Sequence, residues 1–120
     1  MKVFSILLVV VILFSGITAE AEELLSSDPR LTEAIEALKK GQDYMEKGRR
    51  EFKRRPGLAQ TMFEHAEDYF IKASYLYREL GAKYKIRVVN EVAKCESLNR
   101  KAHVMVGKAR KEKKKSKTGF

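Results

Sequence analysis

The stretch FEHAEDYFIKASYLYRELG, residues 63–81, decides the fold of this chain of 120 residues. Its apolar and small residues recur at steps of three and four, the spacing that places side chains on one face of a helix. The residues of this seam are Phe63, Ala66, Phe70, Ala73, Tyr77 and Leu80. Gly81 then predicts the end of the helix. We expect the aromatic rings to form a core face against neighbouring helices; the alternative is an exposed aromatic groove.

A second helix is predicted upstream of this stretch. Asp28-Pro29 is typical of a helix start, with a capping carboxylate followed by proline at the first helical position. Arg54-Arg55-Pro56-Gly57 predicts its end, because the residue before a proline avoids helical angles. Gly41 and Gly48 lie in line with Ala34 and predict close approach of another helix. The apolar positions between are Leu31, Ala34, Ile35, Leu38, Tyr44, Met45 and Phe52.

A third helix is predicted from about Ala82 into the C-terminal tail. Its seam again alternates steps of four and three, through Val88, Val92, Cys95, Asn99, Ala102, Val106 and Ala109. Short connections between long helices favour antiparallel neighbours. The predicted fold class is therefore all-α, with an antiparallel array of three long helices over residues 29–110, after an N-terminal signal helix.

The N-terminus is typical of a secretory signal peptide over residues 1–21. Lys2 precedes an apolar run from Val3 to Phe14, and Ala19 and Ala21 form the small-residue exit that signal peptidases accept. Cleavage is expected between Ala21 and Glu22, with residues 22–28 as a linker. The protein is then exported to the periplasm, the cell envelope or the extracellular space. The alternative is an uncleaved membrane anchor over residues 3–17, although a spanning helix needs about 20 residues.

No catalytic, cofactor or metal site is predicted. His65 and His103 lie on different predicted helices, and the chain has no Glu-x-x-His motif and no glycine-rich phosphate loop. Cys95 is the one cysteine, which excludes an internal disulfide in an exported chain. We expect it to be a buried thiol; an intermolecular disulfide or a reactive thiol is the alternative.

Part of the chain resembles a tetratricopeptide repeat. Ala66-x3-Phe70-x2-Ala73, running on through Leu80-Gly81, is similar to the second helix of that repeat, and Gly41-x2-Tyr44 is similar to its first helix. The resemblance covers about a third of the chain. The spacing from Gly41 to Ala66 is longer than a standard repeat allows. The resemblance implies a protein-interaction scaffold and transfers no binding residues.

The leading functional prediction is a protein-interaction module without catalytic activity, whose partner the sequence does not identify. The contact is expected beside the small residues of the first helix or at tyrosines outside the seam. The candidate residues are Gly41, Tyr44, Gly48, Ile71 and Tyr75. A homo-oligomer is also open, because three long helices can leave one apolar flank uncovered.

The basic tail supports a second prediction. Residues 108–120 hold seven basic residues and one acidic residue, or +6 of the formal net charge of +9. Residues 111–120 are predicted to be disordered. An anionic membrane or envelope surface would contact Lys108, Arg110, Lys111, Lys113, Lys114, Lys115 and Lys117. Such runs commonly bind nucleic acid, but export argues against that partner.

Overall fold

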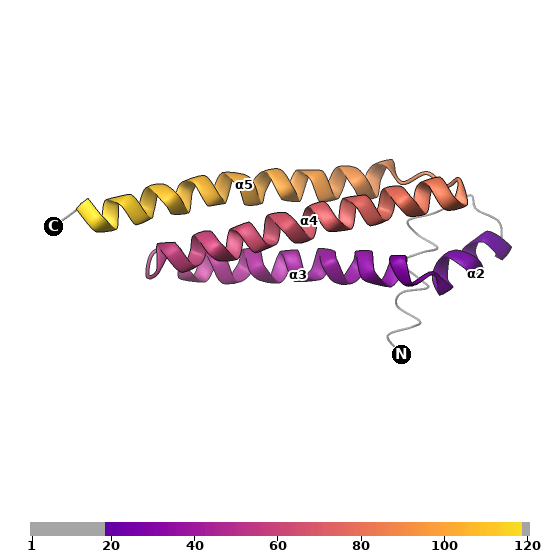
Figure 1. Ribbon diagram of the computed structural model, residues 1–120, viewed down its shortest axis with the longest axis horizontal. Coiled ribbons are helices and arrows are strands. Elements are labelled where there is room, and N and C mark those ends of the chain that lie inside the picture. The colour runs from indigo at the N-terminus through magenta and orange to yellow at the C-terminus, as the bar shows by residue number, and fades with distance from the viewer. Residues whose placement is uncertain (1–18, 119–120) are drawn as a thin grey trace.

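The computed structural model describes residues 19–118, and these residues are all-α (Figure 1). The predicted signal helix and the alternative anchor over residues 3–17 lie outside the described residues. The helices, in chain order, are α2 (Ala19–Ser27), α3 (Pro29–Glu51), α4 (Pro56–Tyr84) and α5 (Val89–Thr118).

Helices α3, α4 and α5 form an antiparallel array in which α4 lies between the other two and packs along both (Figure 1). This arrangement confirms the predicted fold class of three long helices. The seam predicted from residues 63–81 is the centre of the core. All of its members are buried, namely Phe63, Ala66, Phe70, Ala73, Tyr77 and Leu80.

Close contact between α3 and α4 depends on two glycines, as their spacing predicts. A β-carbon on residue 41 would lie 2.5 Å from Cε1 of Phe70, and one on residue 48 would lie 2.5 Å from Cε1 of Phe63. Such distances are far below van der Waals contact, so each ring occupies the volume that a side chain on α3 would need. Both glycines are buried.

Contact between α4 and α5 uses the predicted seam of the third helix. Cys95, Ala102, Val106 and Ala109 are buried. Asn99, the polar residue on that seam, donates a hydrogen bond from Nδ2 to the backbone carbonyl oxygen of Glu67 at 3.1 Å. This bond satisfies the amide at the edge of the interface between the two helices.

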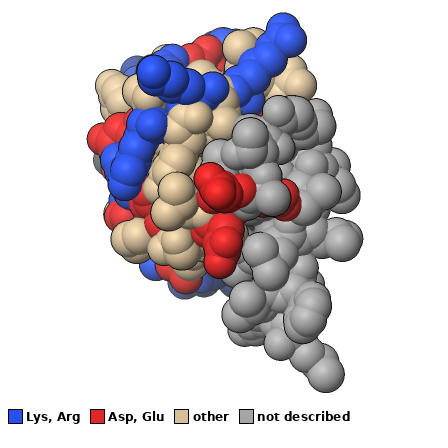
Figure 2. All heavy atoms as spheres, turned by 90° about the vertical axis from the view of Figure 1, so that its right-hand side faces the viewer, with Lys and Arg blue, Asp and Glu red and all other residues tan. Residues whose placement is uncertain are grey.

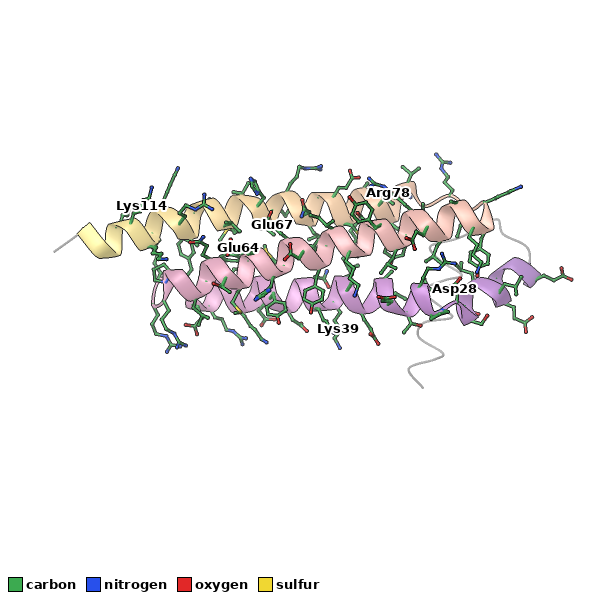
Figure 3. All side chains as sticks on the ribbon, viewed as in Figure 1. Asp28, Lys39, Glu64, Glu67, Arg78 and Lys114 are labelled. Carbon is green, nitrogen blue, oxygen red and sulfur yellow. The ribbon has the colours of Figure 1, made fainter. Side chains whose placement is uncertain are left out.

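Asp28 caps α3 and joins three elements at one end of the molecule (Figure 3). Its Oδ1 accepts from the backbone N–H of Arg30 at 2.9 Å. Its Oδ2 accepts from the hydroxyl of Tyr84 at 2.6 Å and from Nζ of Lys83 at 3.3 Å. The carboxylate therefore ties the α2–α3 junction to the end of α4.

The predicted helix stop at Gly81 is wrong. Helix α4 continues to Tyr84, and the chain reverses at Lys85, which adopts a left-handed conformation with φ of 53° and donates its N–H to the carbonyl of Gly81. A β-carbon on residue 81 would lie 2.7 Å from Cγ2 of Val88. The glycine thus makes room for the returning chain, and α5 begins later than the predicted Ala82.

Two further segments are more helical than the sequence predicts. The stretch 22–28, predicted as a linker, contains most of α2, whose Leu25 is buried in the core. Helix α5 runs to Thr118 through the segment predicted to be disordered. Lysine, arginine and glutamate are good helix formers, and this preference agrees with the continued helix in spite of the charge.

Candidate functional site

The glycines predicted as protein contacts are not on an open surface. Gly41 and Gly48 are covered by the rings of Phe70 and Phe63. Tyr44 is half-buried beside them, stacked on Tyr69 with ring centroids 5.6 Å apart. The space beside the small residues of α3 is therefore filled by α4 and does not form a docking groove.

Ile71 and Tyr75 do lie on the surface, on the face of α4 away from its core seam. Their exposed fractions are 41% and 59%. The guanidinium of Arg78 lies 5.9 Å from the ring centroid of Tyr75. These two candidates lie one helical turn apart, but no hollow adjoins them among those the structure shows in residues 19–118.

A groove between α3 and α5 is the most developed surface feature of the described chain. The two helices flank α4 and leave between them a hollow of about 360 Å³. Its lining combines apolar and basic side chains, which are Met45, Arg49, Ser97, Arg100, Lys101, Val104, Met105 and Lys108. Met45 is buried, whereas Val104 is 54% exposed at the rim.

A second, smaller hollow of about 170 Å³ also lies between α3 and α5, nearer to their N-terminal ends. It is lined by Leu38 from α3, Tyr77 from α4, and Asn90, Glu91 and Lys94 from α5. We name the two hollows together the α3–α5 groove. Burial, together with nearby Cys95 and Glu91, raises the pKa of Tyr77 to about 12, so its hydroxyl stays protonated at neutral pH.

The groove carries one buried acidic group. Glu91 is only 6% exposed, and its Oε2 has no hydrogen-bond partner among the described residues. A buried carboxylate oxygen without a donor is costly, by about 1–3 kcal/mol. Oε2 of Glu91 is therefore the groove atom that most clearly lacks a hydrogen-bond donor among the described residues.

The remaining charge of the groove is positive. Its basic side chains are exposed and make no ion pair with any described residue; they are Arg49, Lys94, Arg100, Lys101 and Lys108. Figure 2 shows basic side chains along the upper edge of the molecule, viewed from the end where α2 lies, and acidic ones nearer the centre. Arg49, Lys94, Arg100 and Lys101 lie outside residues 108–120, so positive charge is not confined to the C-terminal tail.

The tail residues follow α5 past the α3–α4 turn (Figure 1). Arg110, Lys113 and Lys114 line a hollow of about 290 Å³ with Gln60 of α4. Lys111 and Lys115 are exposed. Nζ of Lys53 lies 3.9 Å from Oε1 of Glu112, which joins the α3–α4 turn to the tail. The side chain of Lys117 lies outside the described part of the chain.

Cys95 is buried, and each of the two histidines lies beside a described side chain. Burial is the main cause that raises the pKa of Cys95 to about 11, so the thiol is protonated at neutral pH. Nδ1 of His103 lies 3.1 Å from Oε2 of Glu67, and the ring of His65 lies 5.1 Å from that of Tyr44. Residues 19–118 contain no metal-binding cluster of three or more acidic, histidine or cysteine side chains. None of their helices is both long and apolar enough to span a membrane.

Fold and site together define a small antiparallel three-helix array with a basic-rimmed apolar groove on one side. No family model matches the chain, and neither the curated proteins nor the solved structures include a match to it.

Apart from Lys108, none of the groove residues is among the contact residues predicted from sequence, although a signal is present in the sequence. On α5 a second helical stripe runs beside the seam, through Glu91, Lys94, Leu98, Lys101, Met105 and Lys108. Its steps of three and four place these residues on one face. Recognising that face as a groove also requires the position of α3, which the α5 sequence does not contain.

Proposed function

We propose that this chain is an exported protein-interaction module, not an enzyme, and that it binds a partner protein in the α3–α5 groove. One observation carries the proposal: a hollow between α3 and α5 has buried Met45 at its base, half-buried Met105 and exposed Val104 in its lining, and at its rim cations that have no ion pair among the described residues. Apolar patches framed by charge are typical of interaction sites. Export is supported by the signal-like N-terminal sequence.

The test is capture of envelope or extracellular proteins by the full chain and by two matched variants. Val104→Glu places a charge at the rim of the groove, where the native side chain is 54% exposed. Val89→Glu makes the same change at a valine that is 62% exposed on the same helix and lines neither hollow. A partner that Val89→Glu retains and Val104→Glu loses supports the proposal. Equal capture by both variants contradicts it.

A second candidate function is association with an anionic surface through the tail. It is supported by the cationic C-terminal part of α5, where Arg110, Lys113 and Lys114 gather beside the start of α4. Each cation near an anionic surface contributes about 1 kcal/mol to binding. Dissolved salt screens this attraction, so the binding weakens steeply as the salt concentration rises.

Removal of residues 111–120 separates the two candidates. Surface association predicts that the shortened chain no longer sediments with anionic vesicles at low salt. Groove binding predicts that capture of the protein partner persists in the shortened chain and at high salt. Vesicle binding that is independent of both the tail and the salt concentration would contradict the second candidate.

A further inference from the structure

We infer that the partner segment in the α3–α5 groove is an amphipathic helix, acidic along its N-terminal part and with a lysine or arginine near its C-terminal end. The inference rests on the proposed function and names the chemistry of the partner. The docked helix lies antiparallel to α3 and α5 and completes a four-helix bundle.

The length of the groove fits a helix. The stripe of α5 that faces the groove extends from Glu91 to Lys108 and contributes residues to both hollows. At 1.5 Å per residue this stripe is about 25 Å long, or four to five helical turns. A small ligand would use one hollow, whereas a helix with apolar residues every three or four positions reaches both.

The floor of the groove is suited to apolar anchors. Met45 and Met105 lie in the larger hollow, and Leu38 and Tyr77 lie in the smaller one. Methionine side chains adapt to the shape of the group that packs on them. The larger hollow, of about 360 Å³, is at the lower end of the size range of ligand-binding pockets.

The charges of the groove select an acidic partner. Arg49 on α3 faces Lys101 and Lys108 on α5 across the larger hollow. None of these three side chains has an ion-pair partner within the part of the chain that the structure describes. Glutamate or aspartate on both flanks of a docked helix would meet these cations, and complementary charge of this kind gives specificity and fast association.

Glu91 sets the direction of the helix. It lies in the first turn of α5, at the opposite end of the groove from Lys108, and its buried Oε2 needs a donor. A lysine or arginine of the partner at that end supplies one when the Glu91 side chain turns toward the smaller hollow that it lines, because Oε2 is closed to solvent in the unbound chain. If the docked helix is antiparallel to α5, its C-terminal end lies at the Glu91 end of the groove. Cations near the C-terminus and acids near the N-terminus also agree with the dipole of the docked helix.

The experiment uses three synthetic peptides of about 20 residues with leucine at every third or fourth position. The forward peptide has glutamate flanks in its first two-thirds and lysine in its last turn. The second peptide is its reversed sequence, and the third replaces each glutamate by lysine. Binding to the full chain is measured by fluorescence anisotropy. We expect the forward peptide to bind about tenfold more tightly than the reversed one, and the third peptide not to bind.

Two groove variants and one matched control test the site. Lys101→Glu is expected to weaken binding of the forward peptide about tenfold. Lys39→Glu makes the same change in charge on α3, at an exposed residue outside the groove (Figure 3), and is expected to change binding less than twofold. Glu91→Gln is expected to remove the preference for the forward peptide. Equal binding of forward and reversed peptides, or no effect of Lys101→Glu, overturns the inference.

Two other occupants are tested with the Val104→Glu variant. Binding of phosphatidylglycerol vesicles that Val104→Glu abolishes would make the groove a lipid site and overturn the inference. A dimer in sedimentation velocity that Val104→Glu dissociates would assign the groove to a second copy and also overturn the inference.

If a captured protein depends on Val104 but none of the peptides binds, the proposed function stands and the inference fails. If the forward peptide binds as expected while capture is indifferent to Val104, the groove has the inferred chemistry but the captured partner binds elsewhere, and the proposed function fails.

Discussion

Phe70 of α4 lies so close to Gly41 of α3 that no side chain larger than hydrogen fits between them, since a β-carbon would stand 2.5 Å from Cε1 of the ring. Phe63 and Gly48 repeat the relationship two turns further along. The two pairs bring α3 and α4 together along their length and fix their register.

Alanine at either glycine should destabilise the fold. Gly41→Ala and Gly48→Ala gain about 1 kcal/mol of helix propensity. They also force a buried ring to move, and overpacking of a core costs about 1–3 kcal/mol. We expect a net loss of up to about 2 kcal/mol for each variant in urea unfolding.

Gly107→Ala is the matched control for these two variants. Residue 107 lies within α5, and a β-carbon there would meet nothing within 4 Å. The change should stabilise the protein by up to about 1 kcal/mol. A Gly41→Ala variant as stable as Gly107→Ala would show that the Phe70 ring can move away from α3 without a loss of free energy of unfolding.

The Asp28 carboxylate should make stability depend on acid pH. Hydrogen bonds from the Arg30 side chain, and then from Tyr84, the Arg30 backbone and Lys83, hold the pKa of Asp28 well below its ordinary value of 3.8. A lowered pKa means that the ionised form stabilises the folded state. Its contribution is complete above the ordinary pKa and is lost progressively as the pH falls below that value.

Asp28→Asn tests this dependence, because it keeps a capping side chain but removes the charge. At neutral pH the free energy of unfolding should fall by about 1–3 kcal/mol, the range for hydrogen bonds to charged groups. Between about pH 4 and pH 2 the variant should lose less stability than the native protein. Parallel losses in the two proteins would assign the acid sensitivity to other carboxylates, such as Glu51, whose pKa is lowered to about 2 by hydrogen bonds from Arg55 and Arg54.

Cys95 should be unreactive in the folded protein. Its side chain is fully buried, and burial is the main cause that raises its pKa to about 11. Because the thiolate is the nucleophile, a thiol reagent at about pH 8 should label the native chain slowly and the urea-unfolded chain at once. The chain has one cysteine, so the signal reports this residue alone. Rapid labelling under native conditions would mean that α5 separates readily from α4.

Asn99 should contribute to the contact between α4 and α5. Removing its hydrogen bond to the Glu67 carbonyl by Asn99→Ala should lower the free energy of unfolding by about 1 kcal/mol. Arg100→Ala, at the exposed neighbouring position, should change it by less than about 0.5 kcal/mol. The two variants are compared by thermal or urea unfolding. Equal effects would mean that the hydrogen bond from the Asn99 amide does not stabilise the contact between α4 and α5.

The core could be predicted from sequence because helical spacing is a local property. The seam from Phe63 to Leu80 is buried throughout, and the glycines at 41 and 48 mark a close approach as their spacing indicates. The end of α4 could not be predicted in the same way. Gly81 looks like a helix stop, but it serves contact with Val88, which depends on how the chain returns.

The groove could be predicted only in part for the same reason. Lys101 and Met105 follow a helical stripe on α5, but their partners Met45 and Arg49 lie on a helix far away in sequence. Ile71 and Tyr75 lie outside the predicted seam and are exposed, yet no hollow adjoins them among the described residues. The resemblance of residues 41–81 to a tetratricopeptide repeat stays a prediction.

The central position of α4 has a consequence for the order in which the molecule opens. Both of its flanks are covered, by α3 through the glycine stripe and by α5 through the seam around Ala102. Detachment of α5 would leave an α3–α4 hairpin in which Phe63 and Phe70 still pack against α3. Detachment of α4 would leave α3 and α5 without the helix on which both of them pack. Its backbone amides should therefore be the last to exchange with deuterium, and strain applied to the molecule should release the outer helices first.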